Sequence, residues 1–179
     1  MKTYSWLNQN RFLSHLRFAT ALLLFCFAIV FIWAPTPAMA GEMVPFNGTV
    51  SGQVISITPL DECHIVADVV NGGNATQLGR FTGTAQFTLN VCDLSYIGFY
   101  EFTAANGDSI SGPFFGQLTP TPTPGVFDND ETAFITGGTG RFADATGTFY
   151  LGGQIDLNTG TFALPWHGTI SSVGSTRRH

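Results

Sequence analysis

The strongest constraint on the fold of this chain is an alternation of apolar and polar residues with a period of two. Residues 83–91, 147–157 and 161–170 all follow this pattern, most regularly in the stretch "GTAQFTLNV". Successive side chains of a β-strand point to opposite faces of a sheet, so the pattern predicts three strands that each bury one face. No window after residue 40 carries the apolar stripe of an amphipathic helix. The alternation therefore predicts an all-β protein.

Shorter or less regular segments complete the predicted strand set. They are residues 47–57, 63–70, 96–105, 109–119 and 131–136. Turn signals rich in Asn, Gly, Asp or Pro occur at residues 59–62, 71–74, 106–108 and 158–160. The Thr-Pro-rich stretch at 119–125 predicts an extended connector, because proline cannot donate a backbone hydrogen bond inside a sheet.

About eight short antiparallel strands predict a single eight-stranded β-barrel, since closure removes exposed strand edges. A β-sandwich is the alternative. The acidic stretch Asp128–Glu131 lacks the ligand pattern of a calcium loop, so it is predicted to be a solvated turn.

The first 40 residues have the pattern of a secretory signal peptide. Lys2, Arg11 and Arg17 precede an apolar run at 18–33, and Ala-Met-Ala ends at residue 40. Cleavage there leaves residues 41–179 as one domain, exported to a periplasm or out of the cell. An uncleaved anchor helix is the alternative, although the run is short for a bilayer span of roughly 20 residues.

The predicted mature domain is acidic, because four arginines, no lysine and twelve acidic residues give it a formal net charge of −8. Such a charge is repelled by phosphate, so neither nucleic-acid binding nor docking on an anionic membrane is expected after cleavage. Cys63 and Cys92 are the two cysteines of this domain and predict one disulfide. Metal ligation is the alternative for this pair, but no metal-binding spacing supports it.

The glycine-rich stretch "FITGGTGRFADATG" at residues 134–147 invites comparison with nucleotide-binding loops. The comparison fails because Ala143 takes the place of the third glycine, a strand pattern follows instead of a helix, and the domain has no lysine. No cofactor is therefore expected. Tight turns need glycine where φ is positive, and this predicts a structural role with an aromatic plug. The residues of this predicted motif are Gly137, Gly138, Gly140 and Phe142, with Arg141 beside them to bond carbonyl groups.

The segment "ITGGTGRFADATGTF" resembles a motif of the allene oxide cyclase and dirigent β-barrels. Together with "GNATQLGRFTG", "ANGDSISG" and "HGTIS" it is similar to small exported bacterial proteins built on the same theme. This resemblance spans most of residues 47–172. It implies a barrel whose mouth admits an apolar small molecule, with chemistry depending on the residues that line the lumen.

Candidate lumen residues follow from the strand pattern and this expected architecture. They are Phe87, Phe99, Glu101, Phe149 and Trp166. Glu101 shares a strand face with Phe99 and is the catalytic candidate, but the opposite face of the same strand is also apolar, so the assignment stays open. His64, Asp68 and His167 are predicted to lie outside, and no metal site is expected.

Three functions are compatible with the sequence. The preferred one is non-catalytic binding of a small apolar ligand in the lumen. The alternatives are a cyclase-like or dirigent-like enzyme acting on a hydrophobic substrate, and a surface or matrix protein that makes contacts through Tyr96, Tyr100 or Trp166. The sequence does not identify the ligand, and it is compatible with a homo-oligomer.

Overall fold

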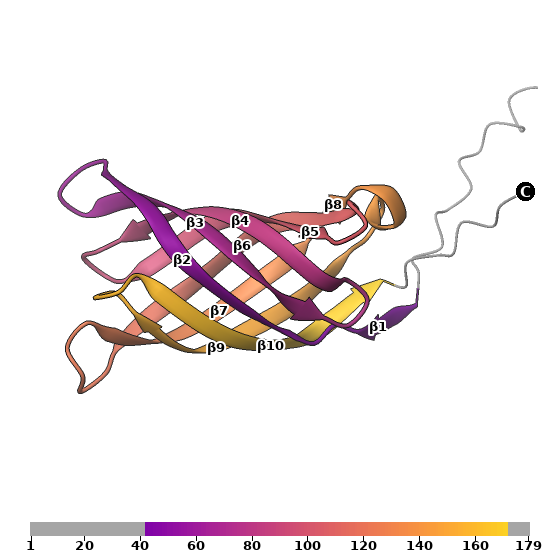
Figure 1. The fold of residues 1–179 in the computed structure, drawn as a ribbon. Coiled ribbons are helices and arrows are strands. Elements are labelled where there is room, and N and C mark those ends of the chain that lie inside the picture. Colours follow the sequence, from indigo (N-terminus) through magenta and orange to yellow (C-terminus); the bar gives the residue numbers. More distant parts are fainter. Residues whose placement is uncertain (1–41, 172–179) are drawn as a thin grey trace, which may run out of the picture. The chain divides into compact units, whose positions relative to one another are not determined.

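The computed structural model describes residues 42–171, so the predicted signal peptide at 1–40 lies outside the described residues. Within these residues, ten strands and one short helix follow each other (Figure 1). The strands are β1 Met43–Pro45, β2 Gly48–Pro59, β3 His64–Ala75, β4 Gly79–Asn90, β5 Ser95–Ala104, β6 Ser109–Pro120, β7 Val126–Ile135, β8 Gly137–Gly138, β9 Gly147–Asp156 and β10 Thr161–Ser171. The 3₁₀-helix η2 spans Gly140–Phe142.

Eight of these strands close into an antiparallel barrel, in the order β2-β3-β4-β5-β6-β7-β9-β10. Closure comes from β10, which pairs with β9 on one edge and with β2 on the other. The short strand β1 pairs with β10 on the same edge as β2. The short strand β8 pairs with β6 beyond the end of β7. The predicted eight-stranded barrel is thus confirmed, and closure excludes the β-sandwich.

Two predicted turns are wrong. Residues 71–74 lie within β3, where Gly73 faces the ring of Phe81; a Cβ at Gly73 would stand 2.8 Å from Phe81 Cζ. The chain instead turns at 76–78, with Gln77 at a φ of 67°. The acidic stretch Asp128–Glu131 is also not a turn, because it forms part of β7 and pairs with both β6 and β9. In both segments, polar or small residues occupy strand positions that local propensity alone assigns to turns.

Glycines on the inner face make room for aromatic rings from neighbouring strands. A Cβ at Gly48 would stand 2.6 Å from Trp166 Cζ2, and one at Gly83 would stand 2.6 Å from Phe102 Cδ1. The rings of Phe102 and Trp166 stack with their centroids 6.0 Å apart. Glycine is therefore needed in this barrel for the packing of aromatic rings inside the lumen as well as for turns.

The glycine-rich motif closes one end of the barrel, the end at which β1 and β8 lie in Figure 1. Gly140 has a φ of 56°, which favours glycine, and Phe142 is completely buried. Arg141 Nη2 donates a hydrogen bond of 2.9 Å to the carbonyl of Gln77, and its guanidinium lies 3.7 Å from Asp108. Phe46 is also completely buried, against Phe149 and Trp166.

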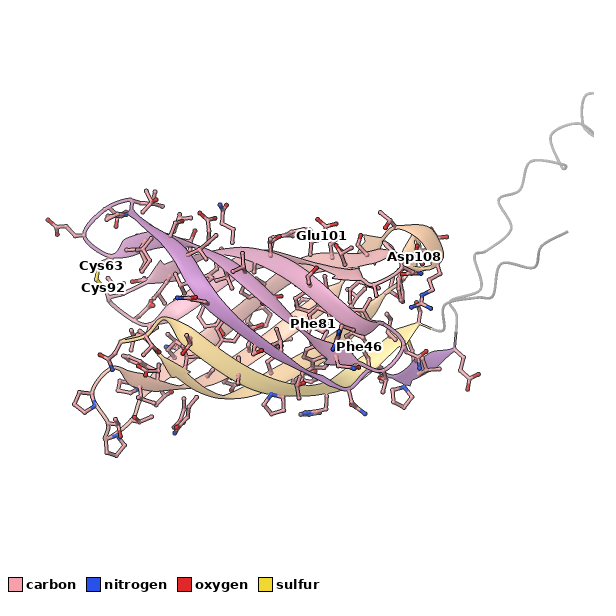
Figure 2. The ribbon with its side chains drawn as sticks, in the orientation of Figure 1. Phe46, Cys63, Phe81, Cys92, Glu101 and Asp108 are labelled. Carbon is pink, nitrogen blue, oxygen red and sulfur yellow. A yellow bond between two sulfur atoms is a disulfide. The ribbon has the colours of Figure 1, made fainter. Side chains whose placement is uncertain are left out.

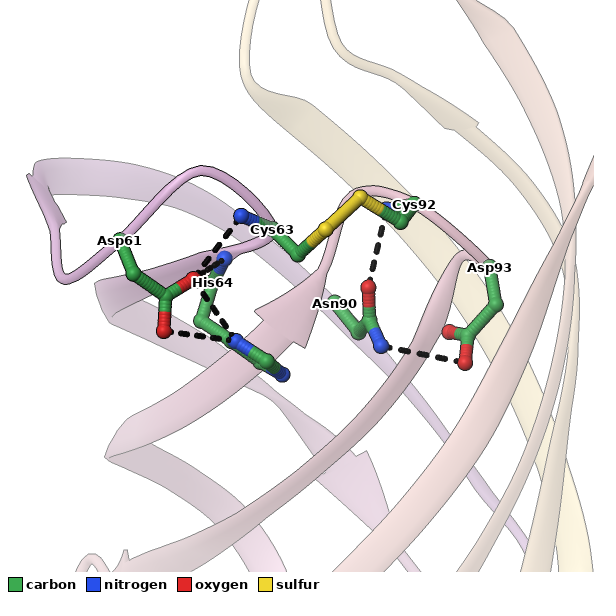
Figure 3. A network of polar contacts seen from close by, with 6 residues as sticks. All are labelled: Asp61, Cys63, His64, Asn90, Cys92 and Asp93. Carbon is green, nitrogen blue, oxygen red and sulfur yellow. Dashed lines mark hydrogen bonds and ion pairs between the residues drawn. A yellow bond between two sulfur atoms is a disulfide. The ribbon is translucent and has the colours of Figure 1, made fainter.

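A disulfide between Cys63 and Cys92, as predicted, joins the β2–β3 and β4–β5 loops at the opposite end (Figures 2 and 3). Hydrogen bonds hold both loops in place: Asp61 Oδ1 accepts from the backbone N–H groups of Cys63 and His64, each at 2.8 Å. Asn90 Oδ1 accepts from the N–H of Cys92 at 2.9 Å. The hydrogen bond from the Cys63 N–H is the main reason that the pKa of Asp61 is lowered.

Candidate functional site

The interior of the barrel contains a cavity. Its volume is about 100 Å³, and all eight barrel strands contribute to its lining. Most lining side chains are aliphatic or aromatic, and the four with polar atoms are Asn71, Tyr96, Tyr100 and Glu131. Leu157 lines the cavity and is 42% exposed, so the cavity meets solvent near the end that carries the disulfide. The plug around Phe46 and Phe142 closes the other end.

Of the five predicted lumen residues, three lie inside. Phe87 and Phe149 line the cavity. Trp166 is buried beside it and packs against Phe149, with ring centroids 5.4 Å apart.

The other two predicted lumen residues lie outside, so their placement in the lumen is wrong. Phe99 is 53% exposed, and Glu101 is exposed and points away from the barrel in Figure 2. Pairing with β4 decides this, because the inward-facing Ala85 lies opposite Tyr100 whereas Thr84 lies opposite Glu101. Opposed residues of an antiparallel pair share a face. Tyr96 and Tyr100 are consequently buried, and Trp166 of β10 is buried as well. All three are therefore unavailable for the surface contacts of the third predicted function.

Glu131 is the acidic residue that does face the cavity. In β7, Asn129, Glu131 and Ala133 point inward, while Asp128 and Asp130 are exposed. A signal for this existed in the sequence, since Phe127, Ala133 and Ile135 already alternate with the outward residues. The run of four polar residues at 128–131 concealed it.

A hydrogen-bonded cluster surrounds the Glu131 carboxyl. Tyr96 Oη lies 2.9 Å from Glu131 Oε2 and also contacts Asn129 Oδ1. The phenol reaches across β6 at Gly116, which pairs with both Tyr96 and Glu131 and whose hydrogen leaves room for the Tyr96 hydroxyl. Tyr100 is satisfied separately, by donating to the carbonyl of Phe134 at 2.9 Å.

Burial controls the ionisation of this cluster. Desolvation raises the pKa of Glu131 to about 7, and the hydrogen bond from Tyr96 opposes part of that rise. Burial, reinforced by the neighbouring Glu131 carboxylate, also raises the pKa values of Tyr96 and Tyr100 above 10.0. Both phenols are therefore neutral at physiological pH, and Glu131 is the group in the cavity that titrates near neutrality.

This ionisation predicts a pH-dependent stability. Between the ordinary pKa of 4.5 and the folded-state pKa of about 7, the folded protein holds a proton that the unfolded chain has released. The free energy of unfolding is therefore expected to fall as pH rises through this window, by at most about 3 kcal/mol. Urea denaturation at a series of pH values measures the fall.

Glu131→Gln provides the control for that series, because a neutral amide of the same shape cannot titrate. The variant is expected to lose most of the decline between pH 4.5 and 7. An unchanged pH profile in the variant would show that another group causes it.

Residues 42–171 contain no group of three or more His, Cys, Asp or Glu side chains arranged to hold a metal ion. The described part of the chain also has no helix that is long and apolar enough to cross a membrane.

The chain was compared with family models, curated proteins and solved structures of other proteins. No family model matches the chain, and no curated protein matches it. The chain is similar to the solved structure of the pterocarpan synthase dirigent protein GePTS1, with a TM-score of 0.45 and 13% sequence identity. The match covers 76% of this chain and 93% of that chain. The assignment of the barrel itself rests on the strand pairing described above.

Proposed function

We propose that this protein is an exported binding protein that holds a small, largely apolar molecule inside its barrel. The observation that carries the proposal is the cavity, which is apolar on nearly all sides, closed at one end and in contact with solvent at the other. Small-molecule sites characteristically combine an apolar concave lining with a few polar groups. The disulfide is in keeping with export to an oxidising compartment.

The size of the cavity limits the ligand. A cavity of roughly 150 Å³ is known to hold benzene. A volume of about 100 Å³ therefore suits a molecule of at most about one ring, with any longer part leaving through the opening at Leu157.

Calorimetric titration of the purified protein with toluene tests the proposal. Saturable binding is expected, because the aromatic and aliphatic lining replaces water around the ring. Ala85→Leu places extra side-chain volume in the cavity and is expected to abolish binding. Thr84→Leu, on the exposed face of the same strand, is the matched control and is expected to bind normally.

Two results would overturn the binding function. One is the absence of toluene binding to the folded protein. The other is binding that survives filling of the lumen, with Val54→Phe as a second filling variant in case Ala85→Leu does not fold. Thermal unfolding of each variant identifies which of them are folded.

The same titration includes a negative control for the outer face. Glu101→Gln is expected to change neither toluene affinity nor the free energy of unfolding by more than about 0.5 kcal/mol, because Glu101 is exposed outside the barrel. Weakened binding in this variant would contradict the assigned orientation of β5.

A second candidate function is an enzyme of the cyclase or isomerase type, favoured by the position of Glu131 in the cavity. General acid–base catalysis works best with a group whose pKa lies near the operating pH, and burial raises the pKa of Glu131 to about 7. The lumen then holds a hydrophobic substrate while Glu131 exchanges a proton with it. Recovery of bound ligand chemically unchanged after long incubation favours binding over this alternative.

A further inference from the structure

The cavity contains an acid without a basic partner. None of the residues that line it is Lys, Arg or His. The ion pairs of the described residues, Asp61 with His64 and Asp108 with Arg141, involve side chains outside the cavity lining. When Glu131 is ionised, its charge is thus balanced by no cationic side chain of the lining. A buried charge of this kind is costly unless a partner is supplied.

Among the described residues, the Tyr96 hydroxyl is the side-chain group that donates a hydrogen bond to the Glu131 carboxyl. Tyr96 has one phenolic proton, yet its oxygen contacts acceptors on both Asn129 and Glu131. Asn71 lines the cavity too, and its Oδ1 is buried with no hydrogen-bond partner among the described residues. Asn129 Nδ2 and Trp166 Nε1 are buried donors without a partner among the described residues, and Asn129 Nδ2 belongs to the same amide whose Oδ1 contacts Tyr96. The Glu131 carboxyl and Asn71 Oδ1 are therefore acceptors in the lining that a hydrogen-bond-donating ligand would satisfy.

Four aromatic rings form the wall beside the acid: Phe87, Tyr96, Tyr100 and Phe114. The Phe87–Tyr96 and Tyr96–Phe114 ring centroids are 5.7 and 6.0 Å apart, and Tyr100 lies 6.5 Å from Phe114. Phe114 lies on β6 two residues before Gly116, and Gly116 pairs with Glu131 of β7. The Phe114 ring and the Glu131 carboxyl therefore lie on adjacent strands. The faces of aromatic rings attract cations.

We propose that the lumen binds a small organic amine as its ammonium ion, with the nitrogen at Glu131 and the hydrocarbon part against the aromatic wall. This rests on the proposed binding function and names its ligand class. An ammonium group donates hydrogen bonds without accepting any, carries the missing positive charge, and interacts favourably with ring faces. The formal charge of −8 on residues 41–179 also attracts cations toward the protein.

Four one-ring probes of nearly equal size test the ligand class: benzylamine, benzyl alcohol, toluene and benzoate. Each is titrated calorimetrically into the purified protein near pH 8, where Glu131 is mostly ionised given its pKa of about 7. Benzylamine is expected to bind at least about tenfold more tightly than toluene or benzyl alcohol. Benzoate is expected not to bind, because its carboxylate meets a carboxylate.

Glu131→Gln identifies the residue responsible. The variant is expected to remove the advantage of benzylamine over toluene, with both probes measured on the variant itself. If benzylamine keeps its advantage in the variant, or has none in the unaltered protein, the amine proposal is wrong. If toluene binds in that case, the proposed binding function survives; if no probe binds, the binding function fails with it.

A pH series on the unaltered protein gives a test that needs no variant. Benzylamine affinity is expected to rise from about pH 6 to about pH 8 as Glu131 ionises, because an alkylammonium group stays protonated over this range. The titratable groups near Glu131 are Tyr96 and Tyr100, which stay neutral, and Asp130, which faces outward on the same strand. A flat profile would overturn the role of Glu131, with toluene serving as the pH-independent reference.

Discussion

Replacing Phe149 by alanine is expected to lower the free energy of unfolding by about 3–5 kcal/mol. Phe149 is 1% exposed, and its ring centroid lies 5.3 Å from that of Phe46 and 5.6 Å from that of Tyr100. It also lines the cavity and thus stands between the closed end and the ligand site. Truncation removes these contacts and leaves a void that the barrel wall fills only in part. Urea denaturation measures the change.

Tyr150→Ala is the matched control for this prediction. Tyr150 is the next residue of β9, but it lies on the outer face and is 48% exposed. Its replacement is expected to cost much less, on the order of 1 kcal/mol or below. Equal losses in the two variants would contradict the assigned faces of β9.

Removing the disulfide, with the double variant Cys63→Ser and Cys92→Ser, is expected to lower the free energy of unfolding by about 3–4 kcal/mol. The bond closes a loop with a sequence separation of 29 residues, and loop-closure entropy in the unfolded chain gives a stabilisation of this size. Denaturation of the oxidised protein and of the double variant measures it.

A reductant control accompanies the double variant. Reduction of the unaltered protein is expected to shift its denaturation midpoint toward that of the double variant, and to leave the variant itself unchanged. The backbone N–H groups of Cys63 and Cys92 donate hydrogen bonds to Asp61 and Asn90, and these bonds are expected to persist in both forms and to limit the loss to the entropic contribution. Identical midpoints with and without the bond would show that these loops are held by other contacts.

Much of the barrel followed from local patterns, but the location of its acid did not. Alternation predicted β9 and β10 to within one residue at each end, because one face of each strand is clearly polar. For β4 it predicted the end of the strand, but it placed the start at residue 83 instead of Gly79. Strand β5 is different, since Phe99 and Tyr100 make both of its faces apolar. Strand β7 was predicted to be partly a turn, and Glu131 was missed with it.

The sequence by itself determined the strand period, the disulfide pair and the structural role of the glycine-rich motif at residues 134–147. The strand period and the glycines depend on backbone geometry and on residues close in the chain. The disulfide pair follows because the predicted mature domain has two cysteines. Only the tertiary structure decided which faces of β5 and β7 point inward, because that depends on pairing with strands that already have a defined inner face. Pairing with β4 turns Glu101 to solvent, and pairing with β6 and β9 turns Glu131 into the lumen. A shift of one residue exchanges the two faces of a strand, so register across the closed barrel decided which acid reaches the cavity.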